Sequence, residues 1–255
     1  MWVGAILIAA VAQLGAQEPD AQTIIEKSVE ANKKDFDAAP DYNHKELDRN
    51  GKQSKLYQIT MVDGTPYQRL VAVNGKPLSK AQEADEMKKQ QQAAAQRKAQ
   101  SPEQRRDRIA KYQRDRTRDN NMMNELTKAF TFSVVGTGKL RGFSVYVLKA
   151  VPKAGYKPPN MDAQVLPGMQ GRLWIEQKSY QWVRVTAQVI HPVSIEGFLA
   201  QVEPGTRFEL EKGPVGNGSW QPTHFQMQSH SKVLFLVNRS SSANETYSDY
   251  TKAVQ

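Results

Sequence analysis

The chain has 255 residues, no cysteine and a formal net charge of +9 at pH 7. The absence of cysteine excludes disulfides, thiolate metal sites, cysteine nucleophiles and a lipidated N-terminal cysteine. A mean hydropathy of −0.65, with 39% hydrophobic residues, indicates a polar, soluble protein.

The first residues form an apolar run, 2–12, which ends at a polar segment that begins with Gln17. Such a run is shorter than the about 20 residues that a helix needs to cross a bilayer. It is typical of the hydrophobic part of a signal peptide, and Gly15 and Ala16 offer a cleavage site, although no Lys or Arg precedes the run. We expect residues 1–16 to be a cleavable signal peptide and the protein to be periplasmic. A buried N-terminal helix is the alternative.

The next segment predicts a short helix and a hairpin. Residues 21–32 place three apolar side chains at helical spacing, which indicates an amphipathic helix. A polar connector follows, and residues 56–62 and 67–73 then have the composition of strands. Asp-Gly lies in the short loop between them, and this pair is a strong hairpin signal.

Residues 79–130 differ in kind from the rest of the chain. Between residues 80 and 130 there are thirteen Lys and Arg against eight Asp and Glu, a local net charge of +5. Most residue types here favour helices, and Ser101-Pro102 predicts the start of a second helix. The first helix has little to bury and is expected to project, whereas the second carries an apolar stripe that could dock. We interpret the segment as a charged helical insertion between strands of one sheet.

The second helix of this insertion carries most of its arginines. A basic surplus attracts nucleic acid, anionic lipid headgroups or lipopolysaccharide phosphates, and export argues against nucleic acid. Interleaved acids favour the alternative, a solvated helix laced with ion pairs. The residues expected to contact an anionic surface are Arg105, Arg106, Arg108, Lys111, Arg114, Arg116 and Arg118.

From residue 131 onward the apolar period changes to two. The candidate strands are 131–135, 143–151, 172–177, 180–190, 206–211, 220–229, 232–238 and 245–251. Their regular spacing predicts an antiparallel meander. In 180–190 the alternation places Val183, Val185, Ala187 and Val189 on one face, as expected for a sheet packed on one side only.

Sequence motifs for catalysis and metal binding are missing. The four histidines, His44, His191, His224 and His230, lack the usual ligand spacings. No nucleophile elbow, phosphate-binding glycine loop or His-Glu-x-x-His sequence occurs. We therefore expect no catalytic residues, no metal and no cofactor, and a protein that is not an enzyme.

Four segments carry a resemblance to a known family. They are Gly171-Arg-Leu-Trp-Ile-Glu176, Tyr180-Gln-Trp-Val-Arg-Val185, Gly218-Ser-Trp220-Gln-Pro222 and Tyr247-Ser-Asp-Tyr250. With the signal segment, helix and hairpin before them, they resemble the LolA-like outer-membrane lipoprotein-sorting superfamily, over roughly 21–78 and 131–252. The resemblance implies an incomplete β-barrel around helices, with a concave cavity for acyl chains. The charged insertion departs from this pattern.

Together these observations predict an α+β fold, mainly β, in which a curved antiparallel sheet forms one domain over 17–255. The expected function is non-catalytic binding of the acyl chain of a lipid or lipoprotein, by a monomer. The expected cavity lining is Leu148, Val183, Val185, Val189, Phe208, Leu210, Phe225 and Met227; ordinary core packing is the alternative for each. The alternative function is an envelope interaction protein that uses the basic insertion to contact a partner protein or anionic lipid.

Overall fold

The fold was obtained as a computed structural model, and it describes residues 19–195, 200–216, 218–233 and 237–253. The expected signal peptide, residues 1–16, lies outside the described residues. The α+β class with a curved antiparallel sheet is confirmed, because the described strands form a single open sheet of thirteen.

Strands from both ends of the chain meet in the middle of this sheet. The strands are β1 (Tyr42–Asn50), β2 (Gln53–Val62), β3 (Thr65–Val73), β4 (Lys76–Pro77), β5 (Phe130–Leu140), β6 (Phe143–Pro152), β7 (Met169–Glu176), β8 (Trp182–Val189), β9 (Val193–Ile195), β10 (Ala200–Val202), β11 (Arg207–Pro214), β12 (Trp220–Val233) and β13 (Val237–Lys252). Their order is β4-β3-β2-β1-β13-β12-β11-β8-β7-β6-β5, and β10 bridges β12 and β9. Since β1 pairs with β13, the N-terminal strands extend the C-terminal meander.

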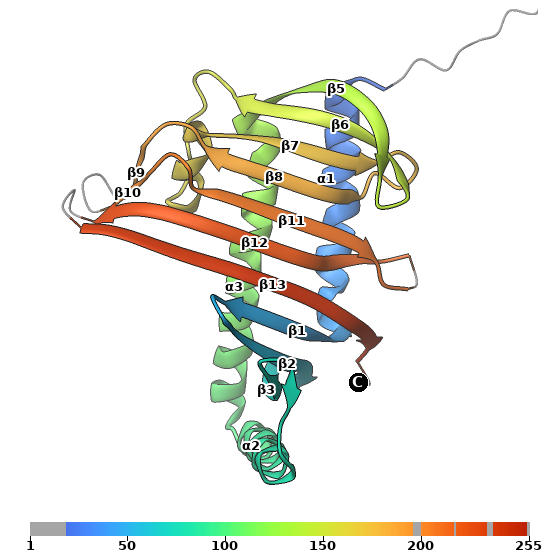
Figure 1. Cartoon of the computed structure of the whole chain (residues 1–255), viewed down its shortest axis with the longest axis vertical. Helices are drawn as coiled ribbons and strands as arrows, with labels where there is room; N and C mark the ends of the chain where they lie inside the picture. Colours follow the sequence, from blue (N-terminus) through green and yellow to red (C-terminus); the bar gives the residue numbers. More distant parts are fainter. Residues whose placement is uncertain (1–18, 196–199, 217, 234–236, 254–255) are drawn as a thin grey trace, which may run out of the picture.

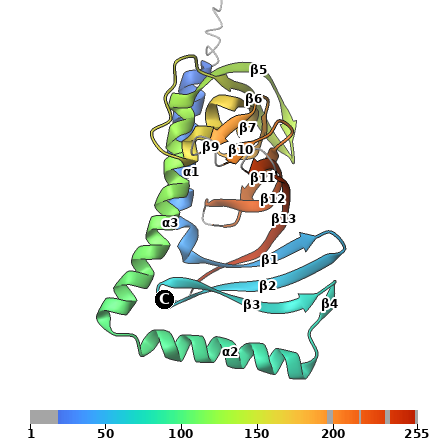
Figure 2. The same cartoon turned by 90° about the vertical axis from the view of Figure 1, so that its left-hand side faces the viewer.

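Three α-helices accompany the sheet, α1 (Ala21–Ala38), α2 (Lys80–Lys98) and α3 (Pro102–Ala129). Helices α1 and α3 lie on the same face of the sheet and run across its strands (Figure 1). The sheet curves around them, as Figure 2 shows from the side. Ser79 and Ser101 each form a capping box that begins α2 and α3, because their hydroxyls satisfy main-chain N–H groups of the first turn.

Helix α2 does not project from the fold as expected, but runs beside β3 at the end of the sheet (Figure 2). It has no buried residue and reaches the strand with polar side chains. Glu86 Oε2 accepts a hydrogen bond from the Leu70 main-chain N–H at 3.3 Å, and Arg97 donates to three main-chain carbonyls around the β2–β3 turn. An edge strand presents unpaired backbone groups, and these contacts give α2 a place on the sheet without apolar burial.

The main core lies between the sheet and the two crossing helices. Ile24 and Ile25 of α1 are fully buried against strands β5 to β8 and β11, and each contributes about 1.5–3 kcal/mol by removing its side chain from water. Met123 and Leu126 of α3 pack on the same cluster. The apolar stripe of the insertion therefore docks, as predicted.

Three parts of the sheet differ from the sequence prediction. Strand β1 replaces part of the expected polar connector, and residues 232–238 include the end of β12 and the start of β13 rather than one separate strand. Strand β5 also continues through Gly136, so that the turn shrinks to Arg141-Gly142, whose φ angles are 51° and 87°. The sequence did not predict β1, because its helix-facing side is polar. The alternation of apolar and polar residues that indicates a strand is therefore missing.

Candidate functional site

A groove runs between the sheet and the crossing helices, and its first part is mostly apolar. We call this part the apolar chamber; it has a volume of about 210 Å³. Its lining is Met123, Leu126, Phe130, Phe132, Ala150, Gln170, Gly171, Leu173, Trp182, Val185, Thr186, Ala187, Phe208 and Leu210. Strands β5 to β8 and β11 supply one wall, and the C-terminal half of α3 supplies the other.

A second part, which we call the polar chamber after the buried polar side chains in its lining, has a volume of about 320 Å³, and most of its surface is also apolar. Its lining is Asn32, Asp35, Phe36, Ala39, His44, Met123, Trp182, Leu210, Lys212, Gln221, Pro222, Tyr247 and Tyr250. These residues come from α1, α3 and strands β1, β8, β11, β12 and β13. The polar chamber therefore requires strands from both ends of the chain.

The two chambers adjoin, because Met123, Trp182 and Leu210 line both of them. Trp182 is held in place by a hydrogen bond from its indole Nε1–H to Ser28 Oγ of α1. Met123 and Leu210 are only half-buried, so solvent reaches this boundary. Ligand pockets in proteins are commonly about 300–1,000 Å³, and the two chambers together fall in that range.

The floor of the polar chamber is a buried charged cluster between α1 and β11. Ser28, Asn32 and Asp35 recur at helical spacing on the buried side of α1. Lys212 Nζ of β11 donates to Asn32 Oδ1 at 2.7 Å and lies 3.6 Å from Asp35 Oδ2. No protein group in the described part of the chain donates a hydrogen bond to that Asp35 oxygen. The two groups form a buried ion pair at a distance slightly longer than a hydrogen bond.

Burial shifts the ionisation of several groups in and beside this chamber. It lowers the pKa of Lys212 to about 8, although Asp35 opposes the shift. It also lowers the pKa of His44, which stacks on Tyr250. Neighbouring Glu46 has its pKa raised by burial and by the charges of Glu245 and Asp48.

The predicted lining residues divide into three groups. Val185, Phe208 and Leu210 line the apolar chamber. Leu148 and Val189 are buried in the main core, with exposures of 0% and 2%. Phe225 and Met227 of β12 are half-buried and line neither chamber.

Val183 lies on a different face from the one predicted. It packs with Val145 and Trp220 in a second cluster, whereas its neighbour Trp182 joins the main core. The pairing of β7 with β8 skips Val183, which is the signature of a β-bulge. One extra residue reverses the alternation beyond the bulge, so the expected face of residues 182 and 183 was wrong.

The sequence prediction missed Asp35, Asn32 and Lys212. Two signals were present in the sequence. The stripe on α1 that begins with Ile24 continues through small polar residues, and Lys212 occupies the next inward position of β11 after Phe208 and Leu210. A lysine at an inward position usually indicates a buried partner.

Two of the predicted surface-contact arginines instead hold the β2–β3 hairpin. We call Arg105, Arg108 and Asp63 the hairpin clamp. The Asp63 carboxylate forms ion pairs with Arg108 Nη2 at 2.6 Å and with Arg105 Nη2 at 2.8 Å. Arg108 also donates to the Asp63 carbonyl at 2.9 Å, to Thr65 Oγ1 at 2.8 Å and to Gln100 Oε1 at 2.8 Å. The clamp joins α3 to the β2–β3 hairpin.

The remaining basic residues of α3 are distributed around the helix. Lys111 forms a solvent-exposed ion pair with Asp115 at 2.8 Å. Arg116 donates a hydrogen bond to the main-chain carbonyl of Phe36 in α1 and lies over the Phe36 ring. Arg118 lies 4.0 Å from Asp162. The other two residues of the prediction, Arg106 and Arg114, are exposed. The structure does not gather the seven side chains into one continuous basic surface.

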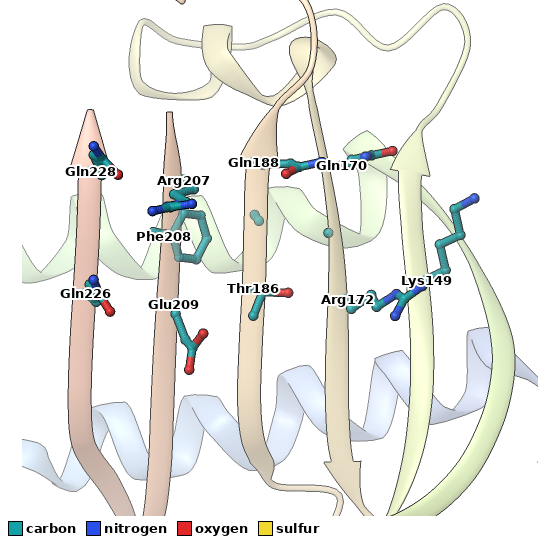
Figure 3. Close-up of a pocket in the computed structure, with 12 residues that line it drawn as sticks. Lys149, Gln170, Arg172, Thr186, Gln188, Arg207, Phe208, Glu209, Gln226 and Gln228 are labelled. Atoms are coloured by element: carbon teal, nitrogen blue, oxygen red, sulfur yellow. The ribbon is translucent and has the colours of Figure 1, made fainter. Parts of the chain in front are cut away.

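A larger hollow, of about 600 Å³, lies on the face of the sheet that the helices do not cover (Figure 3). Paired strands carry its side chains in two rows. One row is Gln228, Arg207, Gln188 and Gln170, and the other is Gln226, Glu209, Thr186, Arg172 and Lys149. This lining is polar and largely solvated, as expected for the open face of an antiparallel sheet. It offers hydrogen bonds but little apolar surface.

No three His, Asp or Glu side chains come together in a way that could hold a metal ion in the described segments. Among the described helices, none is long and apolar enough to cross a membrane.

Comparisons with known proteins found similar structures only. No protein-family model matches the sequence, and no curated protein matches it significantly. A LolA superfamily protein from Nitrosomonas europaea is 11% identical with a TM-score of 0.33, covering 93% of this chain and 94% of its own. A putative outer membrane lipoprotein-sorting protein domain from Vibrio parahaemolyticus is 12% identical with a TM-score of 0.30, covering 89% and 93%.

A DUF1329 family protein from Desulfovibrio piger is 8% identical with a TM-score of 0.30, covering 92% of this chain and 93% of its own. All three alignments extend over about nine tenths of this chain.

Proposed function

We propose that this protein is a non-catalytic carrier or sensor that binds the acyl chain of a lipid or lipoprotein in the groove, in the bacterial periplasm. The observation that carries the proposal is the pair of adjoining chambers, one of which is almost wholly apolar. Each methylene group moved from water into such a site contributes about 0.8 kcal/mol. A chain that enters the apolar chamber can thus be held without a covalent bond.

The groove has the features of a binding site rather than a solid interior. Phe132, Phe208 and Leu210 pack on the core but are only partly buried, so a ligand can displace water from them. The sheet is open along its length, and the crossing helix α3 contributes Met123 and Leu126 to the wall. An acyl chain between α3 and the sheet would complete the burial of these side chains.

The test uses two phenylalanine substitutions at neighbouring positions of β8. Ala187 lines the apolar chamber, whereas Gln188 is exposed on the open face. We expect Ala187→Phe to fill the chamber and to raise the Kd for Nile red and for laurate at least tenfold. Gln188→Phe adds the same ring outside the groove and should bind like the wild type. Overpacking costs about 1–3 kcal/mol, so urea unfolding is measured for both variants.

Mass spectrometry of lipid that copurifies with the wild-type protein gives an independent readout. Recovery of acylated molecules from the wild type and their loss from Ala187→Phe would support the carrier. If the wild type binds neither probe, or if both variants bind as it does, acyl binding in the groove is wrong.

The alternative role, contact of the basic insertion with an anionic surface or an envelope protein, has less support. Arg105 and Arg108 are engaged in the hairpin clamp, and Arg116 is engaged with α1. Deletion of the insertion would not separate the two roles, because α3 supplies part of the groove wall. The matched test is Arg106→Glu with Arg114→Glu, which should leave acyl binding unchanged and abolish vesicle binding only if the alternative holds.

A further inference from the structure

The hollow on the open face of the sheet, which we call the open-face hollow, has a surplus of positive charge (Figure 3). Lys149, Arg172 and Arg207 line it and are exposed. The nearby carboxylates do not neutralise them, because Glu209 and Glu211 are paired with Arg184, and Glu211 also with Arg141. The open-face hollow therefore has three positive charges for which the described residues supply no ion-pair partner.

Two of these charges stand directly opposite each other. Lys149 of β6 is in register with Arg172 of β7, and like charges in this arrangement are destabilising. Elsewhere on the same face the register brings opposite charges together, since Arg184 of β8 is opposite Glu211 of β11 and forms an ion pair with it. A departure from a local rule without compensation is expected at functional sites. An anion bound between Lys149 and Arg172 would supply the missing compensation.

Arg207 forms a second positive centre. It lies on β11, two strands from Arg172 of β7 and one row further along the sheet (Figure 3). With strands about 4.8 Å apart and a rise of about 3.4 Å per residue, the two Cα atoms are about 12 Å apart. Figure 3 shows the side chain of Arg172 directed toward Lys149 rather than toward Arg207. The two centres thus fit a ligand with two anionic groups.

The side chains between and beside the two centres are polar and uncharged. Thr186 and Gln188 of β8 separate the two centres, and Gln170 and Gln228 extend the row of Arg207. An amide and a hydroxyl can each donate and accept hydrogen bonds, which is what the hydroxyl groups of a sugar require.

The open-face hollow lacks the aromatic surface that nucleic acid would use. Among its described lining residues Phe208 alone is aromatic, and Phe208 packs on the main core. Single-stranded nucleic acid is commonly held by stacking of its bases on aromatic side chains. Charge together with hydroxyl-binding groups favours an acidic sugar instead.

We propose that the open-face hollow binds an oligosaccharide with at least two anionic groups, one held by Lys149 and Arg172 and the other by Arg207. Sugar hydroxyls bind Thr186 and Gln188. Arginine binds carboxylates and phosphates through paired hydrogen bonds, so both kinds of acidic sugar fit. The inference goes beyond the acyl-binding function, because this site lies on the opposite face of the sheet from the groove.

The experiment measures binding of fluorescently labelled tetragalacturonate by anisotropy at pH 7. We expect maltotetraose, a neutral sugar of the same length, to compete at least tenfold more weakly. Tetrathymidylate, which has phosphates and bases but no sugar hydroxyls between them, should also compete more weakly. Affinity for tetragalacturonate should fall at least tenfold between about 0.05 M and about 0.5 M NaCl, because salt screens exposed charges.

The decisive variant is Arg172→Gln with Arg207→Gln, which should weaken tetragalacturonate binding at least tenfold. Neither arginine lines the groove, so Nile red should bind this variant as it binds the wild type. The matched control, Arg106→Gln with Arg114→Gln, removes two exposed arginines from α3 and should leave tetragalacturonate binding unchanged.

A second variant, Gln188→Leu, tests the sugar hydroxyls apart from charge. Loss of one hydrogen bond should weaken tetragalacturonate binding about fivefold and leave its salt dependence unchanged. Unchanged affinity in Gln188→Leu, or tighter binding of tetrathymidylate, would overturn the assignment to a sugar. No binding of tetragalacturonate by the wild type, or equal weakening in the α3 control, would overturn the site. None of these results bears on acyl binding in the groove.

Discussion

Two acid–base clusters, the hairpin clamp at the β2–β3 turn and the Lys212–Asp35 pair between α1 and β11, are completed to different degrees. In the hairpin clamp, Asp63 receives two arginines, and Arg108 uses donors from all three of its guanidinium nitrogens. In the polar chamber, Lys212 donates one hydrogen bond to Asn32 and lies 3.6 Å from an Asp35 oxygen that receives no shorter contact from a described donor.

The difference lies in how completely each cluster is hydrogen-bonded. Arg108 of the clamp is fully engaged by protein partners, although Asp63, Gln100 and Arg105 also line an open hollow of about 550 Å³. The Lys212–Asp35 pair is more deeply buried, with side-chain exposures of 8% and 7% against 18% and 19% for Arg108 and Asp63, and yet it is less satisfied. A buried ion pair stabilises a fold only when its remaining hydrogen bonds are made, so the chamber pair contributes less to stability than its burial suggests.

The largest expected effect is loss of one partner of the chamber pair. Lys212→Met keeps most of the side-chain volume but leaves Asp35 without its counter-charge. We expect the free energy of unfolding to fall by about 3–5 kcal/mol, measured by urea denaturation. Lys212→Met combined with Asp35→Leu removes both charges and should recover most of this loss. An equal loss in the double variant would show that the lysine matters for packing instead.

A smaller effect is expected from pH. Burial lowers the pKa of folded Lys212 to about 8 from its ordinary value of 10.5, so above pH 8 the unfolded chain holds a proton that the folded protein has released. Stability therefore rises with pH, by about 2 kcal/mol between pH 7 and pH 9.5. The window stops there because buried tyrosines such as Tyr247, whose pKa is raised by burial, titrate in the unfolded chain near pH 10.

The control for this pH dependence is the double variant at Lys212 and Asp35, in which the rise should be absent. A rise of the same size in that variant would assign the effect to other groups. The clamp should contribute no such slope, because arginine stays protonated throughout this range.

A still smaller effect is expected at the clamp. Arg108→Met leaves Thr65 Oγ1 without the hydrogen bond from Arg108, while Arg105 continues to neutralise Asp63. We expect a loss of about 1–2 kcal/mol in urea denaturation and no change in acyl-probe affinity. A large loss of affinity would show that the clamp governs the groove.

The smallest change in the free energy of unfolding is expected from Lys111→Ala on the same helix. Its ion pair with Asp115 is exposed, with side-chain exposures of 73% and 51%, and exposed pairs contribute about 0–1 kcal/mol. A change larger than this would mean that the charge of α3 stabilises the fold by a route other than the clamp.

Much of the fold was predictable because its signals are local. Asp63-Gly64 predicted the β2–β3 turn, where both residues have positive φ, and Ser101-Pro102 predicted the start of α3. The alternation in β8 predicted its inward face from Val185 onward. It failed at Val183, because a bulge depends on how two strands pair and leaves no mark in one strand alone.

The candidate site was only partly predictable. Val185, Phe208 and Leu210 followed from alternation and line the apolar chamber. The place of Arg108 did not follow, because a basic helix has the same composition whether its arginines face solvent or a carboxylate on another strand. Sequence composition therefore suggested a charged surface where the structure has a clamp.

The sequence by itself determined the helices, most of the strands and the charge of the insertion, since caps, turns and periodicity act between residues close along the chain. Only the tertiary structure decided that Asp35 and Lys212, 177 residues apart by number, share one chamber. That contact arises because α1 crosses the sheet over β11, and such long-range packing is set by the burial of whole elements rather than by any local signal.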